Sequence, residues 1–450
     1  MHRFLPLFLL LVFLASACQT EPQPLPEPDD VLDQELGRAL EAAHADGADH
    51  FKLPDPTDYA RIPADPKNPL TEAKVELGKM LFHDPILGVE PLDAAGRHQY
   101  SCASCHHVAA GFQAGRVQGL GEGGQGFGVR GEGRIIHPEY DPIKVDAQPI
   151  RSPSTLNVAY QEAMLWNGSL SGSEINYGTE DQWTPGSNEE NNQLGFEGVE
   201  TQAIAAMKVH RQNCDMDDMM PLGYPALFDA AFPDVPTPER YNKQQAALAM
   251  AAYERTMLPN RAPWQTYLNG DTDALTDAQK RGATLFMGKA NCVSCHTGPA
   301  LSAMEFHALG MGHLNDNPEP LFKVPADPPQ NLGRGGFTQN PAEYYQFKTP
   351  QLYNLTDSPF YGHGGTFRSV RDVVVYKNNA VPQRTDVPTD RLAPAFRPLG
   401  LTEAEIDDLT EFLERALYDA ELTRFVPESL PSGFCFPNND AMSQADLGCN

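Results

Sequence analysis

The chain has 450 residues, of which 33 are basic and 60 are acidic, so its formal net charge is −27. This excess of negative charge argues against nucleic acid as a partner, because phosphates bind basic surfaces. Its simplest consequence is solubility, although an acidic face could also steer a basic partner protein to the molecule. The length and the hydrophobic content of 41% allow two domains with substantial cores.

Residues 1–17 are typical of a secretory signal, with a basic start, a short apolar run and small residues before Cys18. The run is too short to span a membrane. Cys18 lies where a bacterial lipobox places the cysteine that becomes lipidated. Ala15 stands where leucine is usual, so ordinary signal cleavage is the alternative. Because Gln19 points to the outer membrane by the lipoprotein sorting rule, we expect an outer-membrane lipoprotein on the periplasmic side of the cell envelope.

Residues 18–66 are rich in Pro, Asp and Glu, with one short helical stretch near residues 32–43. This composition predicts a linker between the lipid anchor and the folded part of the protein.

The motif Cys-x-x-Cys-His occurs twice, at residues 102–106 and 292–296. The two cysteines of such a motif form thioethers to a haem, and the histidine becomes an axial ligand of the iron. A zinc ribbon, the main alternative beside a redox dithiol, needs its cysteine pairs about 15–20 residues apart. We therefore predict two haem c groups, attached through Cys102, Cys105, Cys292 and Cys295 and ligated by His106 and His296.

Three further cysteines remain. Cys435 and Cys449 flank a polar loop near the end of the chain, and an exported protein meets an oxidising compartment. We predict a disulfide between them, and we assign no role to Cys214.

An internal repeat follows the expected linker. The matching pieces are residues 77–82 with 281–286, residues 152–157 with 349–354, and Trp166 with His363. Gly- and Pro-rich stretches at residues 119–133 and 318–336 predict loops that cover the haems.

The repeat predicts a mainly α-helical fold of two cytochrome c-like haem domains related by internal duplication, with long loops. The expected parts are an N-terminal haem domain at residues 67–265, a C-terminal haem domain at 266–420 and a disulfide-containing tail at 421–450.

The order of these elements resembles the bacterial di-haem cytochrome c peroxidase superfamily over about residues 67–420. The fragments that carry the resemblance are residues 77–85, 347–354 and 363–365. The superfamily includes hydrogen peroxide reductases and the methylamine-utilisation-type oxidases, which oxidise tryptophan or tyrosine on a partner protein. The resemblance implies that the N-terminal haem is the peroxide site and that the C-terminal haem receives or stores electrons.

The resemblance also implies roles for three side chains. Trp166 takes the place of the tryptophan between the haems, with a packed core tryptophan as the alternative. Gln202 matches the catalytic glutamine, after an insertion at residues 171–197. The family's glutamate falls at Gln212, which cannot exchange protons. We therefore expect His210 to act as acid and base, with an ordinary surface or core histidine as the alternative.

The sixth iron ligands depart from the family pattern. His137 is the candidate for the first haem, and without it that haem would be open, as in the protein-oxidising relatives. On the second haem the family's methionine position falls at Lys377, beside Tyr376, and the oxidising branch uses a tyrosine there. Met311 is a further candidate. A ligand other than methionine would lower the potential of the second haem.

A calcium ion lies between the domains in the family, but its asparagine position holds Ser152 here, so calcium stays an open question.

The sequence therefore predicts a peroxidase that reduces hydrogen peroxide with electrons from a small periplasmic cytochrome c or cupredoxin. An oxidase that modifies Trp or Tyr on a protein substrate is the alternative, and a non-catalytic electron carrier is a third hypothesis. The family often forms homodimers, so a homodimer is also considered.

Overall fold

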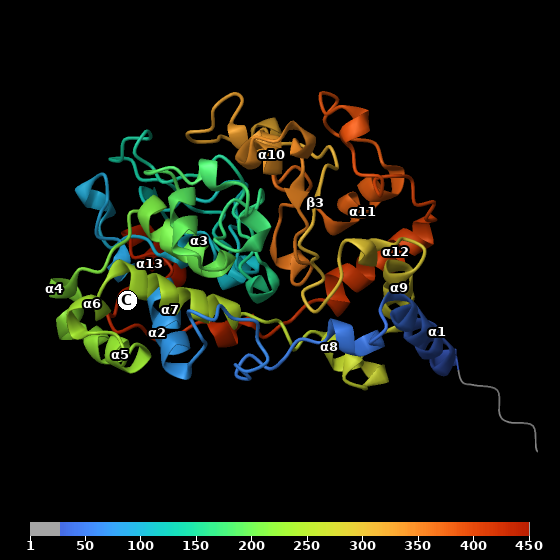
Figure 1. The fold of residues 1–450 in the computed structure, drawn as a ribbon, viewed down its shortest axis with the longest axis horizontal. Coiled ribbons are helices and arrows are strands. Elements are labelled where there is room, and N and C mark those ends of the chain that lie inside the picture. The colour runs from blue at the N-terminus through green and yellow to red at the C-terminus, as the bar shows by residue number, and fades with distance from the viewer. Residues whose placement is uncertain (1–27, 450) are drawn as a thin grey trace, which may run out of the picture.

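A computed structural model describes residues 28–449 of the chain, so the signal sequence and Cys18 lie outside the described residues. The described chain is mainly helical (Figure 1). The two antiparallel ribbons pair β1 (Gly124–Gln125) with β2 (Ile135–Ile136) and β3 (Phe306–His307) with β4 (Phe347–Lys348). Within residues 28–449, no helix combines the length and the apolar character needed to cross a membrane.

The α-helices are α1 (Pro28–Ala43), α2 (Glu72–His83), α3 (Gly198–Val209), α4 (Met216–Met219), α5 (Tyr224–Ala231), α6 (Thr237–Arg240), α7 (Lys243–Arg255), α8 (Pro263–Leu268), α9 (Asp277–Met287), α10 (Gly333–Thr338), α11 (Val370–Asn379), α12 (Glu403–Glu411) and α13 (Ala441–Leu447). Short 3-10 turns and irregular chain connect them. Thr276 and Thr402 each form a capping box with the third residue of the helix that follows, which fixes the starts of α9 and α12.

The buried apolar residues form two main clusters. One is built on α2, α3, α5 and α7, and the other on α1, α8, α9 and α12. The chain passes from the first cluster to the second between Met257 and Leu258, and Leu422 and Phe425 later return to the first. Figure 1 shows these two groups of helices side by side.

Each cluster contains a pair of helices that cross unusually closely at a glycine. A Cβ atom on Gly78 of α2 would lie 1.9 Å from the carbonyl oxygen of Ala249 on α7. A Cβ atom on Gly282 of α9 would lie 2.1 Å from the carbonyl oxygen of Asp408 on α12. Because no other residue lacks a Cβ atom, both crossings require glycine.

The segments that match in sequence also match in local conformation. Asn157 and Asn354 both adopt left-handed backbone angles, with φ of 61° and 53°. Each is followed by a 3-10 turn and then by an isolated antiparallel bridge, Met164 with Leu170 in the first half and Tyr361 with Phe367 in the second.

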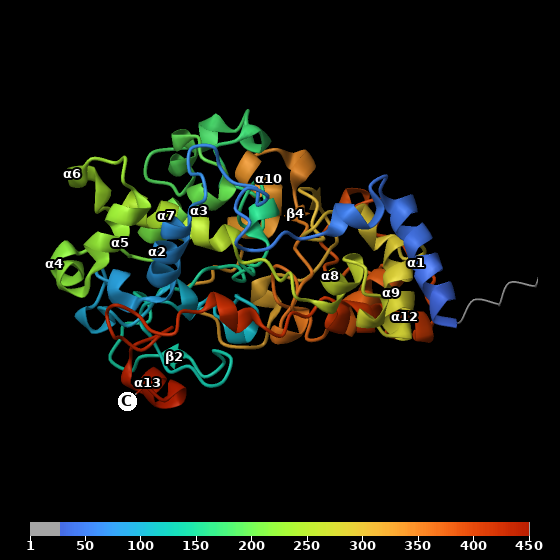
Figure 2. The ribbon, with the colours of Figure 1, turned by 90° about the horizontal axis from the view of Figure 1, so that it is seen from below.

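The segment expected as a linker differs from the expectation. Residues 31–66 are not a free spacer, since Leu36, Leu40 and Phe51 are almost fully buried in the second cluster. Helix α1 lies along α9 in both views (Figures 1 and 2). The composition hides this packing, because a few apolar residues at helical spacing stand among many polar ones.

The C-terminal tail packs against the glycine-rich segment that follows the first Cys-x-x-Cys-His motif. Asp440 accepts a hydrogen bond from the backbone of Gly126, and Asp446 accepts two from Phe127 and Gly128. A disulfide joins Cys435 to Cys449, whose Cα atoms are 5.8 Å apart. The tail therefore holds this segment against the first half of the molecule, as Figure 2 shows for α13 and β2.

The glycine crossing gives a test of the fold. Gly78→Ala is expected to lower the free energy of unfolding by about 1–3 kcal/mol, because the added Cβ must push the two helices apart. Gly37→Ala, inside α1 with nothing within 4 Å of the added atom, is the matched control and is expected to gain about 0.5–1 kcal/mol. Chemical denaturation measures both, and a Gly78→Ala protein as stable as the wild type would contradict the close crossing.

Candidate functional site

A large cavity surrounds the second Cys-x-x-Cys-His motif. Its volume is about 700 Å³, within the usual range for cofactor sites. Cys292 begins a 3-10 turn shortly after α9, and this turn presents both cysteines and His296 to the cavity. The apolar part of the wall comes mainly from α9, α11, α12 and the π-helical segment Phe412–Ala416 that follows it, through Phe286, Val370, Val373, Val374, Leu409 and Leu413.

The residues of this cavity fit a haem c. The Nδ1 atom of His296 donates to the carbonyl oxygen of Leu301 at 2.9 Å, which leaves Nε2 free to bind a metal. Burial lowers the pKa of His296 to about 4, so the imidazole is neutral, as a metal ligand must be. Two buried basic side chains, Arg151 and Lys348, line the same cavity without a carboxylate partner among the described residues. The two carboxylates of a haem c would supply the missing negative charge.

The first motif has the same local structure. The Nδ1 atom of His106 lies 3.3 Å from the carbonyl oxygen of Phe112, and burial lowers the pKa of His106 to about 4. Burial raises the pKa of both Cys102 and Cys105 to about 12. A Cβ atom on Gly119 would lie 2.8 Å from the Sγ atom of Cys105, so the glycine-rich segment approaches the motif directly. The donor set therefore fits a second haem c here.

Trp166 lies in the wall of the second cavity although it belongs to the first half of the chain. Its Nε1 atom donates to the carbonyl oxygen of Arg151 at 2.8 Å. Its ring meets the ring of His363 edge-on, with centroids 6.3 Å apart, and His363 stacks on Phe347 at 3.6 Å. The Nδ1 atom of His313 is 3.0 Å from the Nε2 atom of His363. The rings of Trp166, Phe347 and His313 therefore all lie next to His363.

The side chains expected to handle protons lie on or after α3. Gln202 lies in the middle of this helix, half-buried, and its side chain makes no hydrogen bond to another described residue. His210 follows the end of α3, and its Nδ1 atom is 2.6 Å from a carboxylate oxygen of the buried Asp146. Burial disfavours a charge on His210, but Asp146 outweighs this and raises its pKa.

Gln212 lies beside the first motif. It is buried, and its Oε1 atom is 3.4 Å from the Sγ atom of Cys102. The charge of His210 contributes to the lowered pKa of His106, which places both histidines in one electrostatic environment. The stretch from His210 to Gln212 thus borders the first motif.

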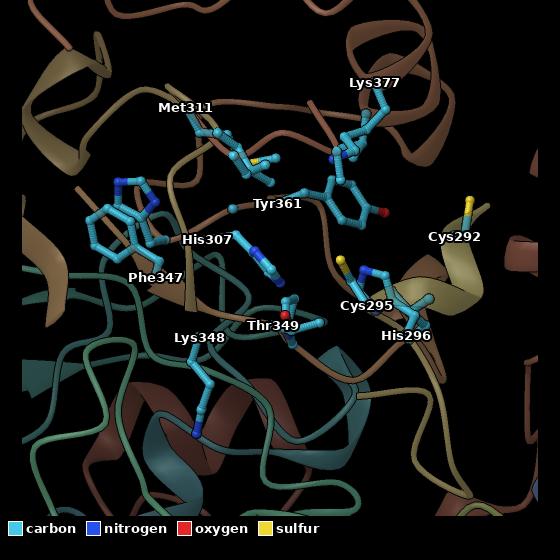
Figure 3. A pocket seen from close by; sticks show the side chains of 18 of the residues that line it. Cys292, Cys295, His296, His307, Met311, Phe347, Lys348, Thr349, Tyr361 and Lys377 are labelled. Atoms are coloured by element: carbon cyan, nitrogen blue, oxygen red, sulfur yellow. The ribbon is translucent and has the colours of Figure 1, made fainter. Parts of the chain in front are cut away.

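The candidates for a sixth iron ligand differ in their surroundings. Lys377, on α11, and Met311 both line the second cavity and extend into it from different segments (Figure 3). Tyr376 does not line it, because its hydroxyl donates to the carbonyl oxygen of Leu309 and its ring packs on Phe396.

His137, the candidate at the first motif, is half-buried in its own turn. Its Nδ1 atom accepts a hydrogen bond from the backbone of Glu139 at 3.3 Å.

Two further features of the described chain concern Cys214 and a group of possible metal ligands. Cys214 packs against the first cluster, and burial raises its pKa to about 12. One group in the described chain has metal-ligand spacing, and it consists of Cys295, Glu305 and His307. It includes a cysteine of the second motif and is not the all-oxygen shell that calcium prefers.

Sequence reasoning missed Lys348 and Glu254. Burial lowers the pKa of Lys348 to about 7, and its Nζ atom donates to the carbonyl oxygen of Ala163 at 2.8 Å and to Gln161. Burial raises the pKa of Glu254 to about 8. Lys348 lies within the matched segment at residues 347–354, so the sequence held a signal for it. The sequence holds no comparable signal for Glu254.

The pair of His210 and Asp146 predicts a pH-dependent stability. The raised pKa of His210 stabilises the fold below its ordinary value of 6.5 and ceases to do so as the pH rises through the folded-state value. The charge of His210 also holds the pKa of Asp146 below 3.8 despite burial, so that contribution is lost only in acid. Asp146→Asn is therefore expected to lower the unfolding free energy more near pH 6 than near pH 9.

Urea denaturation at the two pH values measures this difference. Glu239→Gln, at an exposed position, is the control and should change stability little at either pH. An equal loss at both pH values for Asp146→Asn would contradict the ion pair.

Comparison with known proteins agrees with this geometry. The model of the family described as di-haem cytochrome c peroxidase matches residues 72–273. A cytochrome-c peroxidase named IdrP1 from Denitromonas iodatirespirans is 29% identical over 396 residues, covering 83% of this chain and 88% of that protein. The methylamine utilization protein MauG of Methylophilus methylotrophus is 26% identical over 376 residues, covering 81% and 87%.

Among solved structures, the chain is similar to a MauG-like protein associated with microbial copper homeostasis. The TM-score is 0.55 with 22% identity, covering 83% of this chain and 96% of that one. This likeness concerns the fold.

Proposed function

The chain belongs to the bacterial di-haem cytochrome c peroxidase superfamily, and on that premise we propose that it reduces hydrogen peroxide to water at the first haem motif with electrons received at the second. Each molecule of peroxide takes up two electrons and two protons and yields two molecules of water. Bound haem supplies the iron that exchanges electrons with the peroxide oxygens. The protein must then carry electrons between the motifs and deliver protons.

The position of Trp166 supports this proposal most. The residue comes from the first half of the chain, yet its ring lines the cavity of the second motif. The hydrogen bond to the Arg151 carbonyl fixes the indole, and the His363 ring lies against it. A fixed aromatic ring that joins the two halves is suited to pass electrons between the two motifs.

His210 is the proposed acid and base. Asp146 holds its Nδ1 atom at 2.6 Å, which leaves Nε2 to exchange protons. The raised pKa of His210 suits a group that both gives and takes protons near neutral pH. Gln212, next to Cys102, cannot transfer a proton itself but can hold a peroxide or a water by hydrogen bonds.

The second candidate function is oxidation of a tryptophan or tyrosine on a partner protein. Lys377 at the family's methionine position favours it, because a ligand other than methionine lowers the potential of the second haem. The tyrosine that first suggested this branch, Tyr376, instead bonds to a backbone carbonyl, while Met311 remains within the cavity wall. These contacts favour the peroxidase over the oxidase.

The proposed partners follow from the proposed reaction. A small cytochrome c or cupredoxin would deliver electrons to the second haem, and the acidic surface would attract a basic one. We also propose attachment to the outer membrane through Cys18, on the periplasmic side.

Rapid mixing with one equivalent of hydrogen peroxide tests the function. The half-reduced protein is expected to react fast while its second haem becomes oxidised, and the fully oxidised protein is expected to react slowly. Trp166→Phe is expected to keep both haems but to slow oxidation of the second. Fast reaction of the fully oxidised protein with a long-lived oxidised product would instead support the protein-oxidising enzyme.

The role of His210 has its own test. His210→Ala is expected to reduce the rate of peroxide turnover by about 10²–10⁴-fold, the usual contribution of general acid–base catalysis. His44→Ala, which removes a partly exposed histidine outside the lining of the second cavity, is a control for loss of a histidine elsewhere. Peroxide turnover that survives in His210→Ala would exclude this residue as the acid and base.

A further inference from the structure

Helix α7 faces the first motif with a carboxylic acid. The Sδ atom of Met250 lies 3.8 Å from the Sγ atom of Cys102. Glu254 follows four residues later on the same helix, so its side chain projects from the same face one turn on. The negative charge of Glu254 contributes to the raised pKa of Cys102, which agrees with this proximity.

The second half of the molecule shows what this helix face contacts. At the glycine crossings, Ala249 of α7 corresponds to Asp408 of α12. The neighbouring aromatic pairs keep this register, with ring centroids 5.5 Å apart between Phe82 and Tyr253 and between Phe286 and Phe412.

In this register Met250 corresponds to Leu409 and Glu254 to Leu413. Both leucines line the cavity of the second motif. Glu254 therefore occupies the position at which the second half carries an apolar residue that lines its cavity.

The carboxyl group of Glu254 is not used in an ion pair of the described chain. Its side chain is only 6% exposed, and its Oε2 atom has no hydrogen-bond partner among the described residues. The neighbouring cation, Arg255, is committed to Glu200 at 2.6 Å and to Glu197 at 3.0 Å. A buried carboxyl without a partner costs stability, so it calls for a function.

We propose that Glu254 is a proton-binding group coupled to the first haem, which takes up one proton from solvent when that haem gains an electron and releases it when the electron leaves. The electron comes from the second haem, or from a chemical reductant in the test. The inference rests on haem attachment at Cys102 and Cys105, which is part of the proposed function, but not on the identity of the reaction. Glu254 would thus store a proton beside the site where peroxide reduction consumes protons.

The charges around Glu254 agree with this role. The pKa of Glu254 is raised to about 8, because burial and the negative charge of Glu200 raise it more than Arg255 lowers it. The other charged group near this network is Lys74 of α2, which faces Glu200. Ferric haem carries one more positive charge than ferrous haem, so the pKa of a neighbouring carboxyl must be lower in the oxidised protein. Proton uptake on reduction follows from this difference.

The test is a redox titration of each haem over a range of pH, followed by absorption spectra. At a fixed potential, a tenfold decrease in proton activity is expected to decrease the ratio of reduced to oxidised first haem by up to tenfold within the window set by Glu254. Glu254→Gln and Glu254→Leu are expected to flatten this dependence, since neither side chain titrates. Glu239→Gln, at an exposed position, and the second haem within each protein are the controls and should stay unchanged.

Three outcomes would overturn the proposal. The first is that reduction of the first haem depends on pH in both Glu254 variants as it does in the wild type. The proton-binding group would then be His210 or a haem carboxylate. If both variants fail to bind haem, the reduced-minus-oxidised infrared spectrum of the wild type decides, and absence of a carboxylic acid band change excludes the role. The third is mass spectrometry that finds no haem on Cys102 and Cys105. This result would refute the proposed function together with this inference, whereas the first two outcomes refute the inference alone.

Discussion

In each half of the molecule two helices cross so closely that no side chain fits between them. Gly78 and Gly282 bring the helix before each Cys-x-x-Cys-His motif against the backbone of a later helix. The aromatic residue one turn after each glycine then packs on the partner helix. Because each crossing fixes both the position and the rotation of its helices, it decides which side chains face the neighbouring motif. Leu413 and Glu254 acquire their surroundings from this one constraint.

Buried polar contacts, rather than apolar packing alone, join the two halves. Arg151 donates from its backbone to His363 and from its side chain to Ser358, while Lys348 donates back to the carbonyl of Ala163. The hydrogen bond between the Lys348 backbone and Trp166 belongs to the same contact. Buried cations without carboxylate partners are costly unless an anion is bound. The halves are thus arranged around a cavity whose electrostatics favour a negatively charged cofactor, and the same contact orients the tryptophan.

The mainly helical character of the fold could be predicted from the sequence, because the informative signals are local. The two motifs and the starts of α9 and α12 depend on neighbours within one or two turns. Long-range packing could not be predicted in this way, and the burial of Leu36 and Phe51 is an example. Direction on a helix is equally hard to infer, since successive residues point about 100° apart. For this reason Lys377 faces the cavity while the adjacent Tyr376 does not.

The packing of α1 has a consequence for how the protein would stand on a membrane. With a lipid on Cys18, only residues 18–27 lie between the bilayer surface and a helix that packs along α9. A fully extended segment of that length reaches about 35 Å at most, which is no more than the width of a small protein. The half that carries the second motif would therefore stay close to the membrane, while the first half extends outward. An electron-donating protein would then meet the second motif near the bilayer surface, and peroxide would reach the first motif farther from it.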